Sequence, residues 1–179
     1  MTADDEAPPG GEAPPEPGPV SGADQVFVHL LAGVQEATGR VVHEEIPARP
    51  VGGDRYLLLA TPGLATGCAA GDVIRVNEQG RFAVEVRGGY VAVHVYPPEP
   101  LEPRAIEALR HWIVPLGGVV EAPDPAKFAV ATVPVTAGFN AIEDAMDAWT
   151  SVREETKWFF GNVYDAEGKP LGWWEPQQA

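Results

Sequence analysis

The residues able to do chemistry are few and scattered along this chain of 179 residues. Cys68 lies in the glycine-rich segment 67–71, and no cationic neighbour in the sequence is placed to lower the pKa of its thiol. Asp72 follows at a turn that enters a strand, which is typical of a carboxylate that bonds turn amides. The sequence has no nucleophile elbow, phosphate-binding glycine loop, zinc-protease helix or calcium loop. We therefore predict no catalytic residue.

Two histidines are candidate metal ligands. His29 and His43 fall on consecutive predicted strands, and Glu44 and Glu45 follow directly. In a hairpin the two imidazoles would lie close enough to bind zinc or copper. The spacing is unspecific, because exposed strand histidines are common and the loop between the strands is of undetermined length. We therefore predict no metal site and no cofactor.

A group of aromatic side chains is the most informative candidate. In an alternating strand, Tyr90, His94 and Tyr96 share one face, to which aromatic residues of the last predicted strand can add. Such a face is either buried against the rest of the chain or docks a partner or ligand. Trp173 and Trp174 offer the same choice, between folding back as a clip and forming an exposed anchor. The predicted ligand or partner surface comprises Tyr56, Tyr90, His94, Tyr96, Trp158 and Tyr164.

Charge and composition restrict the possible partners. The chain has 12 Lys and Arg against 26 Asp and Glu, a net charge of −14. Phosphate backbones and anionic membrane surfaces repel such a protein, so neither nucleic acid nor membrane is expected as a partner. The single cysteine suits a reducing compartment, and residues 1–13 lack the pattern of a secretory signal. We therefore expect a cytoplasmic protein whose partner, if it is a protein, is basic; the oligomeric state stays open.

Residues 1–24 differ in composition from the rest of the chain. They combine prolines, glycines and acids with almost no apolar side chains, which predicts a disordered acidic tail. From residue 25, short apolar runs separated by turn residues predict strands, and Gly88-Gly89 predicts a hairpin that pairs Val86 with Val91. The strands are expected at 26–31, 40–46, 55–60, 73–76, 82–86 and 91–96.

The second half of the chain alternates strands and helices. Pro103 opens one helix, with Ile106, Leu109 and Ile113 on its apolar face. A second helix opens at Asn140, whose side chain is expected to cap it. Strands are predicted at 119–121, 128–133 and 158–164. The resulting order is strand, helix, strand, strand, helix, strand, as in ferredoxin-like folds.

These patterns predict an α+β fold. A small, barrel-like β-rich subdomain packs on a carboxyl-terminal ferredoxin-like βαββαβ unit. The expected boundaries are a tail at 1–24, the β-rich subdomain at 25–88, the ferredoxin-like unit at 89–166 and a second tail at 167–179.

One stretch resembles a known family. The similar residues are 48–58 (ARPVGGDRYLL), then Pro62, Gly67 and 71–76 (GDVIRV), with a weaker likeness as far as Trp158 and Tyr164. They resemble a bacterial family known as domain of unknown function 4265. The resemblance implies a short β-rich half followed by a helix-containing half over residues 25 to 165, and it implies no reaction.

The pattern as a whole favours a non-catalytic binding or regulatory protein. In this interpretation an immunity-like or accessory factor docks another bacterial protein through an aromatic, acid-rimmed surface. The alternative is a small enzyme or small-molecule binder with a pocket between the two halves, lined by Tyr56, His94 and Tyr96.

Overall fold

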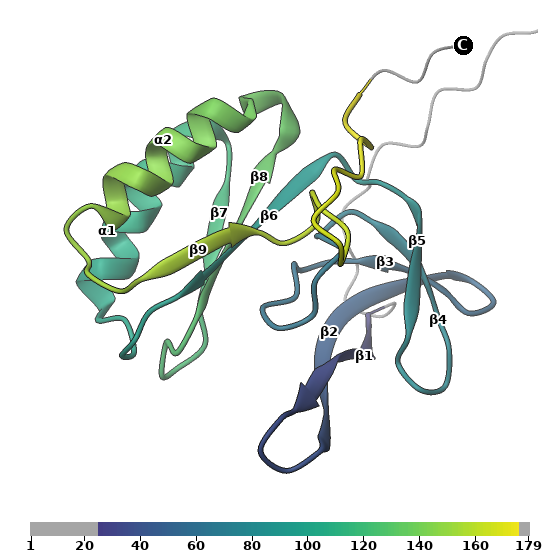
Figure 1. Cartoon of the computed structure of the whole chain (residues 1–179). Coiled ribbons are helices and arrows are strands. Elements are labelled where there is room, and N and C mark those ends of the chain that lie inside the picture. Colours follow the sequence, from purple (N-terminus) through teal and green to yellow (C-terminus); the bar gives the residue numbers. More distant parts are fainter. Residues whose placement is uncertain (1–24, 176–179) are drawn as a thin grey trace, which may run out of the picture.

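The computed structural model describes residues 25–175, which form two antiparallel sheets and two α-helices (Figure 1). The tail predicted at 1–24 lies outside the described residues, as do residues 176–179 of the second predicted tail. The fold is mixed α/β, as the sequence predicts. Within 25–175, no helix is long and apolar enough to cross a membrane.

The first sheet follows the order of the sequence. Its strands are β1 (Val26–Gln35), β2 (Arg40–Gly52), β3 (Arg55–Leu58), β4 (Val73–Val76) and β5 (Phe82–Val86), each antiparallel to the next. The Leu31 amide donates to the Gly80 carbonyl oxygen at 2.8 Å, so the turn between β4 and β5 lies against β1. The sheet therefore curves round an apolar core, whose buried residues include Val28, Leu30, Ile46, Leu58, Cys68 and Ile74.

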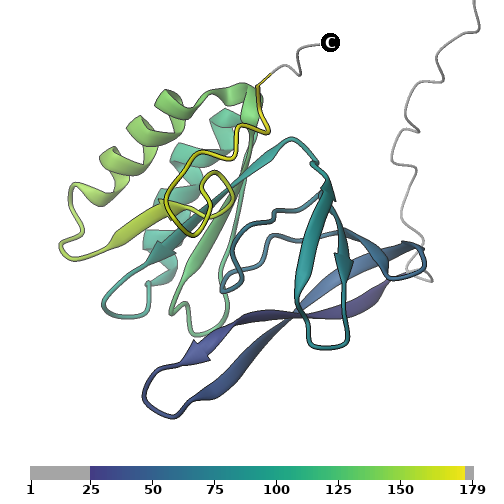
Figure 2. The ribbon, with the colours of Figure 1, turned by 45° about the vertical axis from the view of Figure 1, so that its right-hand side comes forward.

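The second sheet has the order β7-β8-β6-β9. Its elements along the chain are β6 (Tyr90–Tyr96), α1 (Pro103–Ile113), β7 (Val119–Glu121), β8 (Ala129–Pro134), α2 (Phe139–Thr150) and β9 (Lys157–Phe160), with short 3-10 turns at Val114–Leu116 and Val135–Ala137. Both helices cover the face that points away from the first sheet (Figure 2). That face buries Val91, Val93 and Val95 of β6 against Leu109, Met146 and Trp149.

The hairpin predicted at Gly88-Gly89 is wrong. β5 pairs with β4, whereas β6 pairs with β8 and β9, so the two glycines connect the two sheets. Gly88 packs directly on Gly71, where a Cβ would lie 2.3 Å from the Gly71 carbonyl carbon. This contact between distant residues takes the place of a local turn. Val86 is consequently 51% exposed rather than paired with Val91.

The cap of the second helix lies two residues before the predicted Asn140, which falls inside the helix. Gly138, at φ 84°, occupies the cap position, and no side chain caps the helix. The helix instead gains its stability from its buried face of Ile142, Ala145, Met146 and Trp149. The indole Nε1 of Trp149 also donates to the Ala105 carbonyl oxygen at 3.1 Å, which joins the two helices.

Candidate functional site

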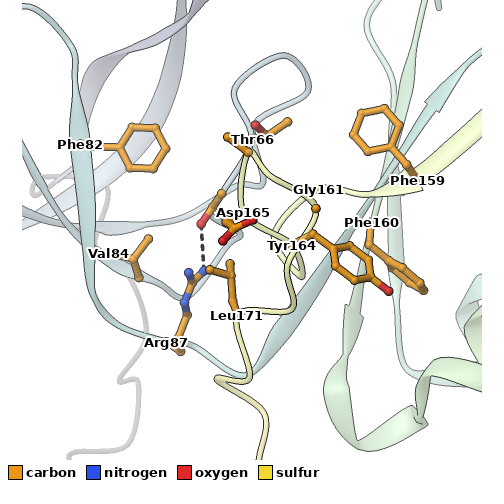
Figure 3. A pocket seen from close by; sticks show the side chains of 13 residues that line it. Thr66, Phe82, Val84, Arg87, Phe159, Phe160, Gly161, Tyr164, Asp165 and Leu171 are labelled. Atoms are coloured by element: carbon orange, nitrogen blue, oxygen red, sulfur yellow. Dashed lines mark hydrogen bonds between the residues drawn. The ribbon is translucent and has the colours of Figure 1, made fainter.

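A cleft of about 770 Å³ lies between the two sheets (Figure 3). Phe82 and Val84 of β5 form one wall. The other wall begins with Phe159 and Phe160 of β9 and continues through Gly161 into the segment that follows. We refer to this space as the inter-sheet cleft. Its lining residues are Thr66, Gly67, Phe82, Val84, Arg87, Phe159, Phe160, Gly161, Tyr164, Asp165, Ala166, Gly168 and Leu171.

Arg87 lies in this cleft, but its charge is already engaged. Its Nη1 donates to the Gly67 carbonyl oxygen at 2.9 Å, drawn as a dashed line in Figure 3, and to Asp72 Oδ2 at 3.1 Å. Asp72 is fully buried and also accepts the amides of Ala69 and Gly88. Burial raises the pKa of the Asp72 carboxyl, and the Gly88 amide and the Arg87 guanidinium oppose that rise. The expected bonding of Asp72 to turn amides is confirmed, and the ion pair with Arg87 adds to it.

The carboxyl-terminal wall of the cleft is a folded-back segment. Asp165 Oδ1 accepts the amides of Glu167 and Lys169, which closes a tight turn. Trp173 Nε1 donates to the Asn162 carbonyl oxygen at 2.7 Å, and the Trp174 ring packs edge-on against Phe139. Of the two alternatives for the tryptophan pair, the structure therefore shows the clip.

The six predicted surface residues do not share one face. His94 and Tyr96 face the first sheet, and the neighbour that joins them is Phe159, with ring centroids 5.2 Å from His94 and 5.8 Å from Tyr96. Trp158 points the other way and packs with the helix-side core. We expected Trp158 on the same face as His94. Phe159 lies there instead, so the predicted alternation of side chains along the last strand is wrong by one residue.

The other predicted residues are also dispersed. Tyr56 packs at the core of the first sheet, and Tyr90 is partly exposed at the start of β6. Tyr164 is 47% exposed and lines the inter-sheet cleft. The expected pocket lining of Tyr56, His94 and Tyr96 is therefore wrong for this cleft. The residues that line it instead include Phe82, Val84, Arg87 and Phe159. Of these, only Arg87 carries a signal in the sequence, as a cation next to Gly88-Gly89.

Polar contacts join the two sheets behind the cleft. The Tyr96 hydroxyl donates to the Gly63 carbonyl oxygen at 2.8 Å, and the hydroxyls of Thr61 and Thr132 lie 2.6 Å apart. The Gly67 amide donates to the Gly161 carbonyl oxygen at 2.7 Å. These bonds fix the spacing between the sheets, and with it the width of the cleft.

His94 is buried within this junction, and neither ring nitrogen has a hydrogen-bond partner. Burial lowers the pKa of His94 below its ordinary value of 6.5, and the Glu44 carboxylate partly offsets this effect. The carboxylate of Glu44 itself accepts the amides of Gly63, Leu64 and Ala65. His94 is therefore an uncharged packing residue at neutral pH.

Stability is expected to fall as the pH drops below about 6.5, because the unfolded chain then binds a proton that the folded His94 excludes. His94→Leu removes the buried polar nitrogens, so it should leave stability at pH 7.5 nearly unchanged or raised and flatten the decline between pH 7 and 5. Urea denaturation at several pH values measures both effects. An equally steep decline in the variant would contradict this role of His94.

The other candidates from the sequence have structural explanations. Cys68 is fully buried in the first core, and burial raises the pKa of its thiol, as does the nearby Asp72. His29 lies 3.4 Å from Glu45, whereas the His43 ring bonds the Gln79 carbonyl oxygen. Over residues 25–175, no group of three or more His, Cys, Asp or Glu side chains is arranged to hold a metal ion.

Comparison with known proteins identifies the family. The family model described as Domain of unknown function (DUF4265) matches residues 44–158. The chain belongs to this family. The matched region includes the Phe82 and Arg87 side of the inter-sheet cleft, whereas the wall from Phe159 to Leu171 follows it in the sequence.

A likeness in fold extends to one solved structure. A hypothetical protein from Neisseria gonorrhoeae superposes with a TM-score of 0.56 at 9% identity, covering 77% of this chain and 93% of that chain. The search of curated proteins found no match. At this identity the likeness concerns the fold alone, so any function has to be argued from the site.

Proposed function

We propose that the protein is a non-catalytic binding protein whose ligand occupies the inter-sheet cleft. The observation that carries the proposal is the composition of that cleft. Both sheets supply apolar side chains to it, and the two charged groups in its lining, Arg87 and Asp165, are already hydrogen-bonded within the protein. Preformed apolar clefts of this size, with a few fixed polar groups, are typical binding sites.

We also assign the second sheet and its helices to the ferredoxin-like arrangement and describe the first sheet as barrel-like. The order of elements from β6 to β9 and the sheet order β7-β8-β6-β9 support the first assignment. The bond between Leu31 and Gly80 supports the second. Such folds host many functions, so these assignments do not themselves specify a ligand.

The location of His94 favours binding over catalysis. A general base has to lie within hydrogen-bond reach of its substrate, whereas His94 is fully buried and forms no part of the cleft lining. The lone cysteine is also enclosed, in the first core. We infer a cytoplasmic protein, because a single thiol suits a reducing compartment.

A fragment screen followed by amide NMR spectra tests the proposal. Fragments that bind should shift the amides of Val84, Gly161 and Tyr164. Tyr164→Ala should weaken the binding of these fragments by about fivefold or more, because an aromatic residue in the wall of a small site usually contributes much of the binding energy. The matched control is Trp112→Ala on α1, whose side chain is 44% exposed and lies outside the lining.

Two results would contradict the proposal. Fragment shifts confined to other surfaces, with Tyr164→Ala behaving like Trp112→Ala, would remove the cleft as the binding site. A cleft ligand recovered in a chemically altered form after incubation with the protein would remove the non-catalytic part.

A further inference from the structure

The inter-sheet cleft reaches the carboxyl-terminal end of an edge strand. Among the described strands, β9 pairs with β6 alone. Phe159, Phe160 and Gly161 are consecutive, and all three line the cleft. Because neighbouring side chains of a strand point to opposite faces, a cleft lined by consecutive residues follows the strand's edge rather than one of its faces. An edge strand presents unpaired backbone N–H and C=O groups, which a further strand can bond.

A backbone group from the first half of the chain already bonds next to this edge. Just beyond β9, the amide of Gly67 donates to the Gly161 carbonyl oxygen, so a backbone group from outside the second sheet bonds here. Opposite β9 stand the apolar side chains of Phe82 and Val84, which lie on the far side of the cleft in Figure 3. An extended segment along β9 would therefore place every second side chain between two apolar walls.

The charges of the site select the segment's composition. Arg87 is neutralised by the buried carboxylate of Asp72, which leaves Asp165 as the unbalanced charge among the described lining residues. The whole chain carries −14, and residues 25–175 keep −8 of it, since the six acids of residues 1–24 stand without any Lys or Arg. Electrostatic attraction to this net negative charge favours a cationic ligand, and repulsion disfavours an anionic one.

We propose that the ligand of the inter-sheet cleft is an extended peptide segment of a basic partner protein, added as a strand beside β9. Its apolar side chains occupy the space between Phe82 and Phe159, and its flanking Lys or Arg residues meet the negative potential around Asp165. This inference rests on the proposed function and names its ligand class. A backbone ligand is favoured over a small molecule because β9 is the edge strand of its sheet, and a peptide can bond the outward backbone groups of an edge strand.

The experiment pans a phage-displayed library of random linear dodecapeptides against the full chain. Enriched peptides should alternate apolar residues and carry net positive charge. As labelled synthetic peptides, they should bind Tyr164→Ala about tenfold more weakly than the parent chain or Trp112→Ala, as for a side chain at the centre of an interface. Asp165→Asn keeps the oxygen that closes its turn, and it should weaken binding about two- to fivefold at low salt and less at high salt.

Backbone methylation identifies the mode of binding. Two versions of the best peptide are made, one with N-methyl groups on its odd-numbered residues and the other with N-methyl groups on its even-numbered residues. Because alternate amides of a strand point to the same side, one version should lose binding by at least about tenfold and the other should retain it. Equal effects of the two versions would overturn strand addition at β9.

The other outcomes separate this inference from the proposed function. Enrichment of acidic peptides, or of none, would overturn the inference. If fragments still bound the cleft in a Tyr164-dependent manner, the proposed function would stand and the ligand would be a small molecule. If neither peptides nor fragments bound there, both would fall.

Discussion

Asp72→Ala is expected to lower the free energy of unfolding by about 3 to 5 kcal/mol, the usual cost of removing one partner of a buried ion pair. The fully buried carboxylate accepts the amides of Ala69 and Gly88 and the Nη1 of Arg87. Alanine leaves all three donors without this acceptor. Because Gly88 belongs to the connection between β5 and β6, the loss should loosen the junction of the two sheets as well as the turn.

Urea denaturation followed by tryptophan fluorescence measures this effect. The matched control is Asp54→Ala, since Asp54 also pairs with an arginine, Arg75 at 3.2 Å, but is about half exposed. Exposed ion pairs contribute little, so the control should leave stability nearly unchanged. A loss for Asp72→Ala as small as that of the control would show that this carboxylate does not hold the junction.

Asp72→Asn distinguishes the charge from the shape of the side chain. The amide keeps one acceptor oxygen but places an NH₂ group against an N–H donor of Gly88 or Arg87. A loss close to that of alanine would indicate an ionised carboxylate in the folded state. A nearly neutral effect would contradict the ionised carboxylate, for which its three N–H donors argue even though burial raises its pKa.

The strands could be predicted because their residues alternate or form apolar runs between turn residues. The structure places β4, β5 and β7 at the predicted positions, and the predicted order of strands and helices from residue 90 onward is confirmed. The connection at Gly88-Gly89 could not be predicted in this way. Two glycines suit a tight hairpin and a sheet-to-sheet connection equally well, and here the packing of Gly88 on Gly71 decides between them.

The candidate site was harder to predict for two physical reasons. The sequence Lys-Trp-Phe-Phe of β9 does not alternate, so nothing local indicates which aromatic residue faces the first sheet; the register with β6 selects Phe159. The cleft also depends on the fold-back that Trp173 fixes by bonding Asn162. Of the predicted residues, Tyr164 alone lines the cleft, because Tyr56, His94 and Tyr96 are packed within or between the sheets.

Gly161→Ala is expected to destabilise the protein by about 1 to 3 kcal/mol, as overpacking of a full interior usually does. A Cβ at this position would lie 2.4 Å from His94 Nε2 and 2.5 Å from its Cδ2. The buried ring has little room to move away, because Phe159 and Tyr96 pack against it. The φ of Gly161 is not positive, so the backbone itself accepts alanine and the cost is steric.

A double-mutant cycle isolates that contact. His94→Ala alone opens a cavity, and in its presence the new methyl group of Gly161→Ala has space to occupy. The two substitutions together should therefore cost about 1 to 3 kcal/mol less than the sum of their separate effects, measured by urea denaturation. Additive costs would mean that the ring and the glycine do not touch. Because Gly161 also lines the inter-sheet cleft, a positive result would show that His94 sets the position of the wall against which the ligand binds.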